Sequence, residues 1–230
     1  MESISTYVTL NIVTAIISLL VAFISWRRRI VQGGSSLFFL MLAVSQWAIS
    51  SALEIAATKL EAKIFWSQVA YLGTLSTPVL FFIFSLDYTG KRSWLKTRNI
   101  LLYFIVPAAT FLLAIANDRH GLIWHSFTPN PVNDRILDYG HGSFFWVGVI
   151  GYAYLCILSG TFTLVSAAVY LRHTHRLQSI TLLIASIFPL LGNILYLLHI
   201  KSLPGVDLTP IGFTISGIVS LFAVFRYRLL

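Results

Sequence analysis

The feature that most constrains this chain is a series of long apolar segments that follow one another along almost its whole length. A helix needs about 20 apolar residues, at about 1.5 Å each, to cross a hydrocarbon layer about 30 Å thick. Seven segments of this kind contain neither Lys nor Arg, and they cover residues 8–26, 36–57, 64–86, 100–116, 144–171, 180–199 and 208–225. The sequence therefore predicts an all-α membrane protein, a bundle of seven transmembrane helices that forms one domain over residues 1–230.

The charged residues support this prediction. They make up 10% of the chain, whereas soluble domains carry about 25% to keep their surfaces hydrated. The net charge of +8 does not indicate a nucleic-acid partner, because the basic residues form short runs between the apolar segments and line no continuous soluble face. We expect membrane lipids, and no nucleic acid, around the chain.

The distribution of Lys and Arg predicts the orientation. Seven spans place the two termini on opposite sides of the membrane, and the cytoplasmic side carries the excess of basic loop residues. With the N-terminus outside, eleven of the 16 Lys and Arg residues lie on the cytoplasmic side. We therefore expect a multi-pass protein of the inner (cytoplasmic) membrane, with a cytoplasmic C-terminus. The one long connection, residues 117–143, is then extracytoplasmic.

Four of the predicted helices carry polar or amphipathic side chains at a similar depth in their outer halves. Such groups must find a partner or line a wet cavity inside a bilayer. The predicted ligand-binding residues are Trp47, Glu54, Gln68, Tyr71, Tyr152, Asn193 and Tyr196. Glu54 is the strongest candidate, because an ionisable group at this depth marks a functional site. The ligand would be a small or lipid-like molecule, and the alternative is a network of interhelical hydrogen bonds without a ligand.

The long connection also contains acidic and histidine side chains that invite comparison with a metal site. They are Asp118, His120, His125, Asp134, Asp138 and His141. Their spacing fits no zinc signature, and solvated loop residues explain them as well. We therefore predict no metal and no cofactor.

Prolines and small residues indicate where helices bend or approach closely. Three predicted helices contain an internal proline, Pro78, Pro107 and Pro189, which frees the carbonyl four residues earlier and makes either a fixed kink or a movable hinge. Gly212, Ser216 and Ser220 share the face of the last helix and allow close packing. We predict that Pro189, Gly212 and Ser216 couple the pocket to the output.

Several stretches, taken in order, resemble the N-terminal seven-transmembrane region of bacterial and archaeal histidine kinases. They are residues 47–54, WSQVAYLG (66–73), PVLFFIFSLDYTG (78–90), NDRHGLIW (117–124), Gln178 after Arg176, PLLGNILY (189–196), DLTP (207–210) and the closing FRYRLL. The resemblance implies a sensory input domain whose last helix leads into a PAS domain and then a histidine kinase, or in some members a diguanylate cyclase. It also implies a homodimer in the full-length protein. The chain contains no phosphoacceptor or ATP-binding segment, so we expect no enzyme activity from it alone.

A receptor is therefore the predicted function, and a small-molecule transporter or channel is the alternative. A transporter would need polar groups that continue to the inner face, where the predicted helices are mostly aliphatic and aromatic. A membrane-embedded hydrolase would need metal ligands or a nucleophile and base on facing helices. A retinal protein is excluded, because no predicted span contains a lysine for a Schiff base.

Overall fold

The structure, a computed structural model, describes residues 2–130, 136–170, 173–198 and 207–226. Its α-helices are α1 (Glu2–Arg27), α2 (Gly34–Ala56), α3 (Leu60–Tyr88), α4 (Thr97–Tyr103), α5 (Ile105–Ile115), α6 (Tyr152–Tyr170), α7 (His173–Leu197) and α8 (Thr209–Arg226). The smaller elements are the 3-10 helices η1 (Arg92–Leu95) and η2 (Asn117–Arg119), the π-helix η3 (Phe145–Gly151), and the strands β1 (Trp124–Pro129) and β2 (Leu137–His141). Asp134 and residues 171 and 199, where two predicted spans end, lie outside the described residues.

Six helical segments of the described chain are long and apolar enough to cross a membrane. They are Ser5–Arg27, Gly34–Ala56, Leu60–Tyr88, Thr97–Ile115, Phe145–Val169 and Ser179–Leu197. The seventh predicted span corresponds to a shorter apolar helix, Thr209–Val224. The helical multi-pass architecture is thus confirmed, whereas the count of seven spans and the orientation stay predictions.

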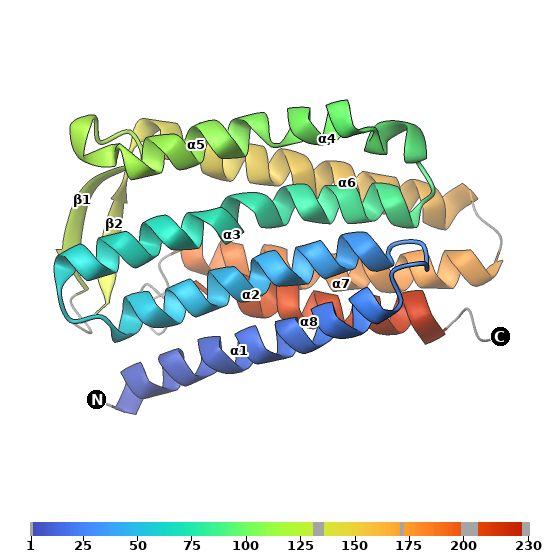
Figure 1. The fold of residues 1–230 in the computed structure, drawn as a ribbon, viewed down its shortest axis with the longest axis horizontal. Coiled ribbons are helices and arrows are strands. Elements are labelled where there is room, and N and C mark those ends of the chain that lie inside the picture. The colour runs from blue at the N-terminus through green and yellow to red at the C-terminus, as the bar shows by residue number, and fades with distance from the viewer. Residues whose placement is uncertain (1, 131–135, 171–172, 199–206, 227–230) are drawn as a thin grey trace.

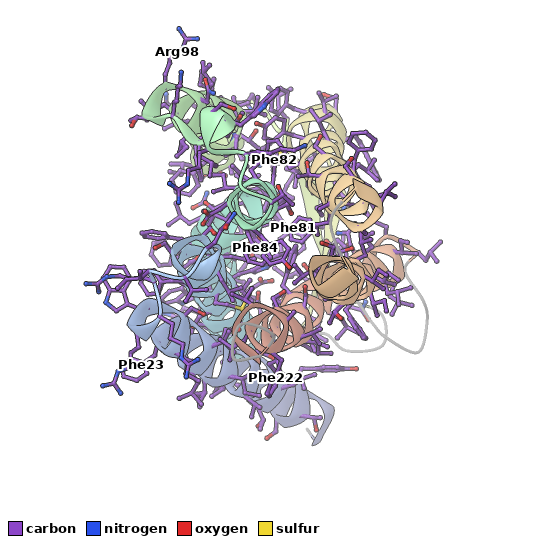
Figure 2. All side chains as sticks on the ribbon, turned by 90° about the vertical axis from the view of Figure 1, so that its right-hand side faces the viewer. Phe23, Phe81, Phe82, Phe84, Arg98 and Phe222 are labelled. Carbon is purple, nitrogen blue, oxygen red and sulfur yellow. The ribbon has the colours of Figure 1, made fainter. Side chains whose placement is uncertain are left out.

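Large apolar side chains lie on the outside of the bundle as well as inside it. Phe81 and Phe84 are 3% and 1% exposed and lie between the helices, whereas Phe23 and Phe222 are 57% and 59% exposed and point outward (Figure 2). A soluble protein cannot expose apolar surface on this scale, but a hydrocarbon environment favours it. The outer surface therefore has the chemistry of a lipid-facing surface.

The helices run roughly side by side along the long axis of the molecule (Figure 1). The main core joins α1, α2, α3, α6, α7 and α8, with Leu37, Met41, Val44, Phe84 and Phe213 buried at its centre. Two glycines allow close approach: a Cβ on Gly73 of α3 would lie 2.6 Å from the Ala43 carbonyl oxygen of α2, and one on Gly217 of α8 would overlap Met41. Small residues serve this purpose in membrane helices.

The predicted span over residues 100–116 corresponds to the candidate span Thr97–Ile115, which contains a local break in its helix. The helix breaks at Phe104 into α4 and α5, three residues before Pro107. Pro107 lacks an N–H group and so leaves the Tyr103 carbonyl without its helical partner. The Tyr152 hydroxyl donates a hydrogen bond to that carbonyl over 2.8 Å. A side chain of α6 thus satisfies the backbone group that the proline exposes.

The two ends of the bundle differ. At one end, β1 and β2 form an antiparallel hairpin that pairs Phe127 with Tyr139 (Figure 1). At the other end, the turn between α1 and α2 is tied to the end of α3, where Ser36 donates to the Asp87 carboxylate over 2.6 Å and Gln32 donates to the Asp87 carbonyl. α1 begins at the hairpin end, and α8 finishes at the opposite end (Figure 1).

The close contact at Gly73 predicts that a larger side chain at this position lowers the stability of the protein. Gly73→Ala should destabilise the protein by about 1–3 kcal/mol, because the new methyl group would force α2 and α3 apart. Leu72→Ala is the matched control, since Leu72 is 46% exposed on the same helix. Thermal unfolding of the protein in detergent measures both effects. Equal stability of Gly73→Ala and wild type would contradict the tight α2–α3 packing.

Candidate ligand-binding site

A cavity lies at the hairpin end of the bundle, and we call it the main cavity. It encloses about 970 Å³ of space, part of which is open to solvent. Its wall is formed by residues of α1, α2, α3, η3, α7 and both strands, together with Ile136 and Asp207. Its polar and aromatic lining consists of Asn11, Trp47, Ser51, Glu54, Lys63, Ser67, Tyr71, Thr74, Trp124, Tyr139, His141, Phe145, Asn193, Tyr196 and Asp207.

The hairpin is joined to the helices by one tyrosine. The Tyr139 hydroxyl donates to the Glu54 carboxyl oxygen Oε1 of α2 and also lies within hydrogen-bond distance of the Ser67 hydroxyl of α3. Burial, and then the neighbouring Glu54 carboxyl group, raises the pKa of Tyr139 well above its usual range. The hydroxyl therefore keeps its proton and acts as a donor. This contact holds β2 against α2 and α3 across the cavity.

Lys63 stabilises the same end of α2. The last carbonyl groups of a helix have no intrahelical partner, and the Lys63 ammonium donates to the Glu54 carbonyl over 3.0 Å. Lys63 is 5% exposed. A cation at a helix C-terminus also interacts favourably with the helix dipole. The lysine thus fixes the helix end that carries Glu54.

A turn organised by Asn117 delivers an aromatic side chain to the cavity. The Asn117 amide oxygen accepts from the backbone N–H groups of Ile123 and Trp124, each over 3.0 Å, and its Nδ2 donates to the Trp124 carbonyl over 2.8 Å. Gly121 allows this turn by adopting a φ of +60°. Trp124 then packs edge to face on Tyr71, with 4.8 Å between the ring centroids. The stretch over residues 117–124 therefore builds part of the cavity wall.

Asp207 connects the main cavity to the last helix. Its Oδ1 accepts from the backbone N–H of Thr209, the first residue of α8, over 2.9 Å and so caps the helix. The same side chain lines the main cavity. Burial raises the pKa of Asp207, and the hydrogen bonds from Thr209 oppose this shift. A ligand in the cavity would thus lie beside Asp207, which precedes α8.

A second, mostly apolar cavity, which we call the deep cavity, lies further along the bundle and shares wall residues with the main cavity. It encloses about 440 Å³ and is bounded by both Pro78 and Pro189. Trp47 and Asn193 line both cavities. The Tyr154 hydroxyl donates to the Asn193 amide oxygen over 3.1 Å. The two cavities are therefore neighbours, the main cavity with polar and aromatic walls and the deep cavity with a mostly apolar wall.

Five of the seven predicted ligand-binding residues line the main cavity: Trp47, Glu54, Tyr71, Asn193 and Tyr196. Gln68 lies elsewhere, because its amide donates to the Ala114 carbonyl of α5 over 3.1 Å. Tyr152 lies elsewhere because it satisfies the Tyr103 carbonyl. The ligand-binding role of the set stays a prediction.

Gly212 and Pro189, two of the three predicted coupling residues, lie at the contact between α7 and α8. Pro189 and Ser216 are buried. A Cβ on Gly212 would lie 2.5 Å from the Phe188 carbonyl oxygen and 2.8 Å from the Pro189 Cα. The two backbones therefore touch at the proline that bounds the deep cavity.

Sequence reasoning missed several wall residues. They are Lys63, Tyr139 and His141, which belong to segments that were interpreted as connections between helices. For Tyr139 and His141, the direction of the side chain depends on the hairpin register. His141 is half-buried and stacks on Phe145 with 3.7 Å between centroids, so it is not an ordinary solvated loop residue. Within the described residues, no group of three or more His, Cys, Asp or Glu side chains is placed to hold a metal ion.

Removing the bridging hydroxyl should weaken the hairpin contact. Tyr139→Phe should destabilise the protein by about 1–3 kcal/mol, because the Glu54 carboxyl group loses a buried donor. The control is Tyr103→Phe, which removes an exposed hydrogen bond to the Trp94 carbonyl. Thermal unfolding in detergent compares the two variants, and hydrogen exchange of residues 136–141 reports the hairpin itself. An unchanged exchange rate in Tyr139→Phe would contradict the bridge.

Comparison with known proteins agrees with this architecture. No sequence among curated proteins matches the chain. A family model described as the N-terminal 7TM region of histidine kinase matches residues 10–230. The match includes every helix that lines the main cavity, and the chain belongs to this family of histidine kinase N-terminal regions.

Proposed function

We propose that the chain is the sensory input domain of a histidine kinase and that the main cavity binds its stimulus, a small-molecule or lipid-like ligand. One observation carries this proposal: the cavity wall includes both the hairpin and Asp207, the cap of the helix nearest the C-terminus. Family membership supports the sensory role. The cavity supplies a place where a molecule can act on the helix that leads out of the domain.

A ligand can shift the output only if it binds one arrangement of helices better than another. The Tyr139 bridge provides a contact that a ligand can replace, because Glu54 and Ser67 both face the cavity. A ligand that binds the Glu54 carboxyl group in place of the Tyr139 hydroxyl would release β2 from α2 and α3. A ligand that fits beneath the intact bridge would instead hold the hairpin in place.

The conformational change that a ligand causes at the main cavity would reach the output through α8. Gly212 packs on the backbone at Pro189, and the deep cavity lies beside that proline. Because an internal proline removes a backbone hydrogen bond and lets a helix bend, a filled cavity can alter the angle of α7 against α8. The far end of α8 would then move at the opposite end of the bundle.

The transporter alternative receives no support from the described core. Beyond the deep cavity, the centre of the bundle is filled by Leu37, Met41, Phe84 and Leu164, all less than 2% exposed. A permeation route would need a polar or wet path through this region. Close packing of apolar side chains fits a receptor better.

If the contact between α7 and α8 transmits the signal, substitutions in it should change the basal output. Pro189→Ala and Ser216→Leu should each move the basal autophosphorylation of the full-length kinase by about fivefold or more, since coupling energies of 1–3 kcal/mol correspond to such factors. Pro189→Ala restores a backbone donor in α7, and Ser216→Leu separates α8 from its neighbours. The measurement uses native membranes and normalises for the amount of protein.

The matched controls alter the outer faces of the same helices. Ile187→Ala and Ile215→Leu affect side chains that are 50% and 38% exposed, and both should keep wild-type output. If all four variants behaved like wild type, coupling through this contact would be wrong, although the sensory assignment would remain.

A further inference from the structure

The wall of the main cavity contains a buried hydrogen-bond acceptor, the side-chain oxygen of Asn11. Asn11 of α1 is 2% exposed, and its Nδ2 donates to the Tyr7 carbonyl over 3.0 Å. Its Oδ1 is buried and has no hydrogen-bond partner among the described residues, and Asn11 itself lies in the cavity wall. A buried acceptor without a partner costs about 1–3 kcal/mol. A bound molecule with an N–H or O–H group would remove that cost.

Two carboxyl groups face the same space. Glu54 lies at the end of α2 and Asp207 precedes α8, and each has one oxygen already in a hydrogen bond. Lys63 is the only Lys or Arg among the described residues that line the cavity. Its ammonium donates to the backbone carbonyl of Glu54 at the helix end. The formal charge of the lining is therefore negative, which favours a cationic partner.

The walls between these groups are aromatic. Trp47, Tyr71, Trp124 and Tyr196 line the main cavity, and the faces of such rings attract cations. The neighbouring deep cavity has a mostly apolar wall and shares Trp47 and Asn193 with the main cavity. A molecule with a positive donor group at one end and an apolar body would match both parts.

We propose that the ligand of the main cavity is an organic cation, a protonated amine that carries an apolar group. This inference rests on the proposed sensory function and specifies its stimulus. The ammonium N–H groups would donate to Glu54, Asp207 and the Asn11 amide oxygen. An ammonium beside a carboxyl group favours the ionised carboxylate, so charge and hydrogen bonds act together. The apolar group would extend past Trp47 toward the deep cavity.

Three probes of similar shape test the charge preference. They are 3-phenylpropylamine, which is protonated at pH 7, the neutral 3-phenylpropanol, and the anionic 4-phenylbutanoate. Each is titrated into the full-length protein in phosphatidylcholine nanodiscs, with empty nanodiscs as the blank for partition into lipid. Binding is measured by calorimetry and by the fluorescence of the wall tryptophans. The amine should bind about tenfold or more tightly than the alcohol, the factor expected for hydrogen bonds to charged groups, and the anion more weakly still.

Isosteric variants locate the site. Glu54→Gln and Asp207→Asn should each weaken amine binding by about tenfold while leaving the alcohol's affinity unchanged, and asparagine still caps α8. Glu61→Gln is the matched control, because Glu61 is an exposed carboxylate in the first turn of α3. It should bind the amine as wild type does.

The outcomes separate this inference from the proposed function. Equal affinities for the three probes, tighter binding of the anion, or an equal loss in Glu61→Gln would overturn the cationic ligand. If the alcohol or the anion binds and the wall tryptophans report it, the cavity remains a ligand site of different chemistry. If no probe binds, the cationic ligand is wrong, and the sensory assignment then rests on the response of autophosphorylation alone.

Discussion

The bilayer offers no hydrogen-bond partners, and this constraint organises both the fold and the site. Every polar group that α2, α3, α6 and α7 carry inward must find another group of the protein. The Tyr152 hydroxyl satisfies the carbonyl freed by Pro107, the Lys63 ammonium satisfies the end of α2, and the Tyr139 hydroxyl satisfies Glu54. The first two contacts satisfy backbone carbonyls that a proline or a helix end leaves without a partner. The third crosses a cavity, so a molecule that enters the cavity can compete for it.

The position of that contact links the hairpin to the last helix. Tyr139 and Asp207 line one space, although 68 positions separate them in the sequence. Asp207 caps α8, and α8 packs at Gly212 on the backbone of α7 beside Pro189. A single ligand in this space would therefore lie beside both the hairpin and the residue that caps α8. On the proposed function, the binding site and the output helix would then share Asp207, and no separate relay between them would be needed.

The sequence predicted the helices well because the hydrocarbon thickness sets their length and composition. It predicted the site in part, because helical periodicity shows which residues share a face but not which neighbour that face meets. Tyr71 turns to the main cavity, whereas Gln68, three residues earlier, turns to α5. Tyr152 was assigned to the pocket because the sequence does not show its hydrogen-bond partner. That partner is the Tyr103 carbonyl, 49 residues earlier, which is free because Pro107 lacks an N–H group. Tyr139 escaped notice because the pairing of β1 with β2, which the sequence did not predict, decides where its hydroxyl points.

The central claim is a cavity at the hairpin end that opens to the outside of the cell. Cysteine labelling tests it directly, since the natural Cys156 is buried and unreactive toward a bulky reagent. The account predicts that a membrane-impermeant maleimide labels Ser51→Cys, in the cavity wall, on intact spheroplasts. Ser93→Cys, exposed at the opposite end of the bundle, should react only after permeabilisation. Labelling of Ser93→Cys on intact spheroplasts, or of Ser51→Cys only after permeabilisation, would contradict the account.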